Sequence, residues 1–93
     1  MNAEDLVCEL EVSTSRLIAA LLAGDHQVLE YFERRRSALQ EIQRLPPGAM
    51  PPSLFPRLQA AWRGGQIAEA RVRRERNEMQ RRLSEFGRQN GGG

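Results

Sequence analysis

Residues 17–25, Leu-Ile-Ala-Ala-Leu-Leu-Ala-Gly-Asp, decide how this chain of 93 residues folds. Seven apolar residues end at Gly24, and a charged segment with apolar residues at helical spacing follows. Glycine accepts the left-handed conformation that ends a helix, and an aspartate side chain accepts hydrogen bonds from the free amides that begin the next one. Gly24 and Asp25 therefore predict a tight turn between two helices, although the apolar pattern runs on almost unbroken from Leu21 to Val28.

The first helix is predicted over residues 3–22, and Asn2 before it has a side chain suited to cap it. Apolar residues recur there at alternating steps of four and three, which is typical of a helix that buries one face. Leu6, Ile18 and Leu22 widen this face, so the helix can pack against two neighbours at once. The central stripe consists of Ala3, Val7, Leu10, Thr14, Leu17 and Leu21.

A second helix is predicted over residues 26–44, because four large apolar residues lie on one side of it and most charged residues lie elsewhere. We interpret Arg34-Arg35-Arg36 as a solvated face, with contact to an anion or nucleic acid as the alternative. The four apolar residues of this helix are Leu29, Phe32, Leu39 and Ile42.

Residues 45–52 hold four prolines and a glycine, which cannot continue a helix.

A third helix is predicted over residues 53–86, with Ser53 as its N-cap. Each glycine of Gly64-Gly65 costs about 1 kcal/mol relative to alanine, so we expect a kink or a close helix approach there. At 1.5 Å per residue the first two helices are each about 30 Å long and the third is about 50 Å long. The sequence thus predicts an all-α fold of three antiparallel helices, two short and one long, in an up-down-up bundle or an elongated helical hairpin.

The predicted domain spans residues 1–88, and residues 89–93 form a predicted disordered tail.

The overhanging end of the third helix carries apolar residues that one chain cannot cover. Helix-in-groove recognition uses apolar anchors at this spacing, and methionine adapts to varied partners. We therefore expect this end to bind a second copy, giving a homodimer, or another polypeptide; the alternative is ordinary core. The predicted partner-binding residues are Val72, Met79, Leu83 and Phe86.

The chain lacks the residues that most catalytic sites need, so we do not expect an enzyme. All fourteen basic residues are arginine, which excludes lysine chemistry, and the only histidine is His26, predicted to lie on the surface beside the turn. No catalytic, cofactor-binding or metal-binding residues are predicted, since ligand pairs at suitable spacing are missing. The single cysteine, Cys8, is interpreted as a buried structural thiol in a cytoplasmic protein, with a reactive or intermolecular thiol as the alternative. No apolar run reaches the length that membrane insertion requires.

Charge is divided unevenly along the chain. Residues 1–45 carry eight acids and five arginines, a net charge of −3, whereas residues 46–93 carry four acids and nine arginines, a net charge of +5. The two halves attract each other, or attract a second copy. The arginines after residue 70 encircle the helix among glutamates, so nucleic acid is an unlikely partner. A helical dimerising regulator that binds nucleic acid weakly through the third helix is the alternative function.

Residues 17–86 resemble the small flagellar type III export chaperones, which hold filament-cap or hook-filament-junction subunits before secretion. The resemblance lies in the order and spacing of several short elements. These are Leu21-Leu22-Ala23-Gly24-Asp25 leading into Val28-Leu29, then Arg35-Arg36 with Leu39 and Ile42, a proline-containing loop, and a long polar helix with Asn77, Met79 and Leu83.

The resemblance implies a cytoplasmic, non-enzymatic protein. Its exposed helical groove would bind an amphipathic helix from the C-terminal region of an export substrate, a flagellar axial protein, and keep that substrate soluble and unassembled. The high arginine content of the third helix is a departure from the family. We expect a second copy or the bound substrate to cover this helix.

Overall fold

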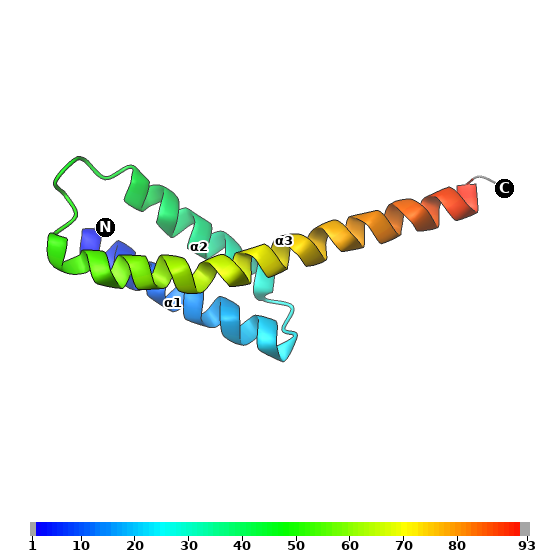
Figure 1. The fold of residues 1–93 in the computed structure, drawn as a ribbon, viewed down its shortest axis with the longest axis horizontal. Coiled ribbons are helices and arrows are strands. Elements are labelled where there is room, and N and C mark those ends of the chain that lie inside the picture. Colours follow the sequence, from blue (N-terminus) through cyan, green and yellow to red (C-terminus); the bar gives the residue numbers. More distant parts are fainter. Residues whose placement is uncertain (1, 92–93) are drawn as a thin grey trace.

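The computed structural model describes residues 2–91, with side chains described up to residue 87. The fold is all-α, as predicted, and no strand occurs among the described residues. Figure 1 shows that α2 runs back along α1 and that α3 then returns beside both, which gives the predicted up-down-up order. The elements are α1 (Ala3–Ala23), α2 (Val28–Gln43), a short 3-10 helix η1 (Pro52–Leu54) and α3 (Phe55–Gly91).

Helix α3 overhangs the other two, as its predicted length requires. Its 37 residues compare with 21 in α1 and 16 in α2, which makes α3 about 55 Å long. The molecule measures 61 × 27 × 19 Å, and the C-terminal half of α3 leaves the bundle and projects beyond the α1–α2 turn (Figure 1). The helix continues past its predicted end through Gly91; the rest of the predicted tail, residues 92–93, lies outside the described residues.

The turn after α1 forms where the sequence predicts it. Gly24 has φ 66° and ψ 30°, the left-handed conformation, and its amide donates hydrogen bonds to the carbonyls of Ala20 and Leu21. The side chain of Asp25 accepts a hydrogen bond of 2.9 Å from the amide of Gln27, so α2 begins at Val28, two residues later than predicted. Asp25 thus shapes the turn and does not cap the first turn of α2.

The two other predicted caps have different outcomes. Asn2 caps α1 by accepting a hydrogen bond of 2.8 Å from the amide of Asp5. Ser53 does not cap α3, because it lies within η1, and α3 begins two residues later at Phe55. The amide of Leu54 donates to the carbonyl of Pro51, and this tight turn replaces a side-chain cap at the exit of the proline loop.

A narrow core runs along the bundle in three clusters. Small side chains make up much of it, including four alanines. The cluster near the proline loop contains Ala3, Val7 and Leu54; the middle cluster contains Leu10, Ala38 and Ala61; the cluster near the turn contains Leu17, Phe32, Ala68 and Val72.

Cys8 is exposed, so its interpretation as a buried thiol was wrong. Its position on α1 turns it away from the apolar stripe and toward the edge of α3. There the Nη2 atom of Arg57 lies 3.4 Å from the cysteine Sγ atom. The thiol therefore belongs to a polar surface contact between α1 and α3.

The same surface contact joins Arg57 to Glu11. Arg57 donates hydrogen bonds of 2.6 and 3.3 Å to the two carboxylate oxygens. These hydrogen bonds hold the pKa of Glu11 below its ordinary value of 4.5. Because the carboxyl has a lower pKa in the folded state than in the unfolded state, its contribution to stability is present above about pH 4.5 and is lost as the pH falls through the lowered pKa.

We therefore expect Glu11→Gln to lower the Tm by at most a few degrees near pH 7, because the pair is solvent-exposed. The difference from the wild type should shrink as the pH falls below 4.5 and through the lowered pKa of Glu11, because the carboxyl then becomes protonated in the folded state as well. Thermal unfolding followed by circular dichroism at several pH values checks this. A difference that grew on acidification would contradict the assignment.

Candidate partner-binding surface

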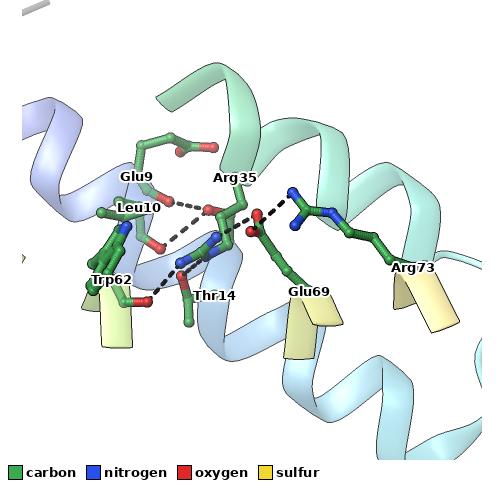
Figure 2. A network of polar contacts seen from close by, with 8 residues as sticks. Glu9, Leu10, Thr14, Arg35, Trp62, Glu69 and Arg73 are labelled. Atoms are coloured by element: carbon green, nitrogen blue, oxygen red, sulfur yellow. Dashed lines mark hydrogen bonds and ion pairs between the residues drawn. The ribbon is translucent and has the colours of Figure 1, made fainter. Parts of the chain in front are cut away.

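Arg35 of α2 is fully buried and joins all three helices (Figure 2). Its Nε atom donates a hydrogen bond of 3.0 Å to the hydroxyl of Thr14 on α1, and its Nη2 atom donates one of 3.0 Å to the main-chain carbonyl of Trp62 on α3. Its Nη1 atom lies 2.5 Å from a carboxylate oxygen of Glu69 on α3. The interpretation of this arginine as part of a solvated face was wrong.

The contact between Arg35 and Glu69 is an ion pair without the alignment of a hydrogen bond. The Glu69 side chain is 7% exposed, and its other oxygen lies 3.8 Å from Nη2 of Arg73. Removing two charges from water is costly, and the cost is offset only if each charge meets its opposite and its remaining donors find acceptors. Thr14 and the Trp62 carbonyl supply acceptors for Nε and Nη2, whereas Nη1 has its ion pair with Glu69 and no hydrogen-bond acceptor.

The neighbours of Arg35 in the arginine run have separate environments. Arg34 is half-buried and donates a hydrogen bond of 2.8 Å to the carboxylate of Glu9 on α1. Arg36 is exposed and lies over the ring of Phe32, 5.9 Å from its centroid. Successive residues of a helix differ by about 100° in direction, so three adjacent arginines cannot share one face.

Gly65 provides the space for the Arg35 guanidinium. A Cβ atom at residue 65 would overlap the Nε, Cζ and Nη2 atoms of Arg35, whereas a Cβ atom at Gly64 would meet nothing within 4 Å. The close contact at Gly65 is therefore with a side chain of α2, so the glycine makes room for Arg35 and does not mark a close approach of the α2 and α3 backbones. The α3 helix runs unbroken through both glycines.

This contact fixes which side of α3 faces the bundle. Gly65, Ala68 and Val72 lie on the inner side and are buried. The same side continues past the bundle as Met79, Leu83 and Phe86, whose exposed fractions are 65%, 64% and 66%. We call these three residues the projecting stripe. Val72 is 5% exposed and packs against Leu17 and Phe32, so of the four predicted partner-binding residues it belongs to the core of the single chain.

A hollow of about 470 Å³ adjoins the projecting stripe where α3 leaves the bundle. Its apolar wall comes from the end of α1, the start of α2 and the middle of α3. A neighbouring hollow of about 240 Å³ lies between α1 and α3 and shares Leu21 and Arg71 with the first. The apolar residues of the larger hollow are Leu21, Val28, Leu29, Val72 and Met79, and those of the smaller one include Ile18, Leu22 and Ile67.

The exposed residues around these hollows were not predicted as partner-binding residues. Leu22 is 78% exposed, Leu29 57% and Ile67 81%. Sequence periodicity assigned Leu22 and Leu29 to buried helix faces, because it cannot show where a neighbouring helix ends. Together with the projecting stripe, these residues form an apolar surface at the turn end of the bundle.

The opposite side of α3 is basic. Arg73, Arg74, Asn77 and Arg81 line one face, together with Ala70 and with Glu78, whose carboxylate is paired with Arg82. Arg74 and Arg81 form no ion pair with the side chains that the structure describes, whereas Arg71 pairs with Glu75, and Arg82 with Glu78, along the helix. The arginines of α3 thus surround it, as predicted: Arg74 and Arg81 share a face that points away from the stripe, whereas Arg76, which also forms no ion pair with the described side chains, lines the 470 Å³ hollow beside Met79.

Nothing in the described part of the chain resembles a metal centre, since no group of three or more histidine, cysteine, aspartate or glutamate side chains is placed to hold an ion there. His26 is exposed beside the turn, with its Nδ1 atom 3.4 Å from a carboxylate oxygen of Asp25. None of the helices within residues 2–91 is both long and apolar enough to cross a membrane.

No protein-family model, curated protein or solved structure matches this chain. The apolar surface at the turn end, with the residues that position it, is the feature of this chain that bears most directly on function.

Proposed function

We propose that this protein is a cytoplasmic chaperone or adaptor of flagellar type III secretion, which binds an amphipathic helix of an export substrate and keeps that substrate soluble. The observation that supports this proposal is the projecting stripe, where Met79, Leu83 and Phe86 are each about two-thirds exposed on a helix that extends past its own bundle. A large apolar surface of this kind marks an interaction site.

The geometry of the stripe suits a helical partner. Met79, Leu83 and Phe86 are spaced by four and three residues, so they form one ridge about 10 Å long. Fully burying a large apolar side chain contributes about 1.5–3 kcal/mol, and because about two-thirds of each of the three is exposed, covering them would contribute roughly 3–6 kcal/mol before the costs of association. The 470 Å³ hollow beside Met79 can accept a further apolar side chain of the partner.

The proposed partner is the C-terminal helical segment of a flagellar axial protein, as the resemblance to the export chaperones implies. Such a segment is apolar along one face and would aggregate or assemble early if that face stayed in water. Covering it with the projecting stripe requires no catalytic group, which agrees with the proposal of a non-enzymatic role.

We expect Leu83→Asp to weaken binding of such a segment by about tenfold or more, because it places a charge in the apolar contact. Isothermal titration with synthetic peptides of the C-terminal helices of the filament-cap and hook-filament-junction proteins measures this. Leu83 is exposed, so the variant should retain the Tm of the wild type.

Ser84→Asp is the matched control, since Ser84 is an exposed neighbour on the side of α3 away from the stripe. Its affinity for the peptides should equal that of the wild type. Absence of binding to every peptide, or equal affinity of the Leu83→Asp variant, would contradict the proposal.

The basic face of α3 supports a second candidate function, a helical dimerising regulator that binds nucleic acid. Arg73, Arg74 and Arg81 lie on one side of a projecting helix, where they can reach phosphates. Affinity for duplex DNA would then fall steeply with salt concentration, because phosphate contacts release counterions. Charge reversal at Arg74 and Arg81 would abolish it and leave peptide binding unchanged.

A further inference from the structure

The face of the α1–α2 hairpin that α3 leaves uncovered holds a groove of about 620 Å³. Leu6 of α1 and Ala38 of α2 form its apolar floor. Three carboxylates of α2, those of Glu30, Glu33 and Glu41, stand along one rim and are exposed. No residue of α3 lines this groove. We call it the acidic groove.

The charge balance of the groove is negative. Glu9 of α1 also lines it, but that carboxylate is already paired with Arg34, the only basic residue of the lining. Glu30 and Glu33 form no ion pair with the described side chains, so they are available to a cation from outside. A partner helix with a basic face would therefore match the charge of this groove.

The basic face of α3 has matching spacing. On α2 the groove residues Glu30, Glu33 and Ser37 stand at offsets of zero, three and seven, and on α3 Arg74, Asn77 and Arg81 stand at the same offsets. Each set extends over about 10 Å of helix. In the register that sets Arg74 opposite Glu30, Arg81 stands opposite Ser37, about one helical turn from both Glu33 and Glu41.

The acidic groove and the basic face cannot meet within one chain. Helix α3 packs on the bundle through the side that bears Val72, and Arg74 and Arg81 point away from that side. The groove lies on the uncovered face of the α1–α2 hairpin. Because the two surfaces carry opposite charge and remain apart within one chain, a second copy of the chain is the occupant that both fit.

We propose that the protein forms a two-fold dimer in which the basic face of α3 of each copy docks into the acidic groove of the other. A two-fold arrangement satisfies both grooves and both basic faces at once. This inference goes beyond the proposed function and does not depend on it, since the projecting stripe lies on the opposite side of α3 and stays free for a partner helix.

The test is a charge exchange measured by sedimentation equilibrium. One variant carries Glu30→Arg with Glu33→Arg, and the other carries Arg74→Glu with Arg81→Glu. Each alone should dimerise about tenfold more weakly than the wild type or worse, because like charges then face each other. An equimolar mixture of the two should dimerise again, because each altered groove meets an oppositely altered α3. All four residues are exposed, and circular dichroism checks that both variants are folded.

Arg63→Glu, an exposed charge reversal on α3 outside both surfaces, is the control and should dimerise like the wild type. The proposal is overturned by a monomeric wild type at about 100 µM, by undiminished dimerisation of either double variant, or by a mixture no better than its components. It is also overturned if Leu83→Asp separates the dimer, or if Arg74→Glu with Arg81→Glu abolishes DNA binding while the mass is unchanged.

Discussion

Gly65→Ala should lower the free energy of unfolding by roughly 2–4 kcal/mol, a large fraction of the stability of so small a domain. The added Cβ atom would occupy the position of the Arg35 guanidinium. Either α3 must move away from α2, or Arg35 must leave the hydroxyl of Thr14 and the carbonyl of Trp62. Both outcomes leave a buried charge with poorer partners, which is costly.

Gly64→Ala is the matched control for this prediction. Nothing lies within 4 Å of a Cβ atom at residue 64, and alanine is favoured over glycine in a helix by about 0.5–1 kcal/mol. Urea unfolding should therefore show a stabilised Gly64→Ala variant and a destabilised Gly65→Ala variant. Equal effects of the two substitutions would show that Gly65 is not in contact with Arg35.

Glu69→Leu should cost about 3–5 kcal/mol, because it leaves the fully buried guanidinium of Arg35 without an opposite charge. Arg35→Met should cost less, since the carboxylate of Glu69 keeps Arg73 nearby at 3.8 Å. The double variant should lose less stability than the sum of the two single losses, because neither charge is then buried alone.

Urea unfolding of the wild type, both single variants and the double variant measures the coupling between Arg35 and Glu69. We expect it to be about 1–3 kcal/mol in favour of the pair. Additive losses would show that the two side chains do not interact in solution. The result matters for function because this pair sets the rotation of α3 on the bundle.

The helical architecture could be predicted from local residues. Gly24 and Asp25 mark the turn, and the prolines between residues 46 and 52 mark the second break, since glycine and proline act through their own backbone preferences. Helices α2 and α3 each begin two residues later than predicted, because hydrogen bonds in the preceding turns hold those residues outside the helix. Asp25 bonds to the amide of Gln27 within the turn, so α2 starts later than its apolar pattern indicates.

The interior of the bundle could not be predicted in the same way. An arginine within Arg34-Arg35-Arg36 looks like surface, and only the positions of Thr14, Trp62 and Glu69 on two other helices make a buried guanidinium possible. The glycine pair was the one local signal, since glycine in a helix indicates a close approach. The glycine pair did not reveal that the side chain packed against Gly65 is that of Arg35.

The candidate surface was predicted in part. Helical periodicity placed Met79, Leu83 and Phe86 on one stripe, and all three are exposed on the projecting helix. The same periodicity included Val72, which is buried because the α1–α2 hairpin reaches that far along α3. Where a bundle ends depends on the lengths of all its helices, so the boundary between core and partner surface is a property of the tertiary structure.

Hydrogen exchange along α3 tests most directly whether the projecting stripe is a binding surface. In the free protein, at a concentration where it is monomeric, amides of residues 58–72 should exchange slowly and those of residues 80–87 quickly, because only the former pack on the bundle. Addition of an axial-protein peptide should slow residues 80–87 and leave the Leu83→Asp variant unchanged. Slow exchange of residues 80–87 in the free monomer, or no change on adding the peptides, would contradict the account.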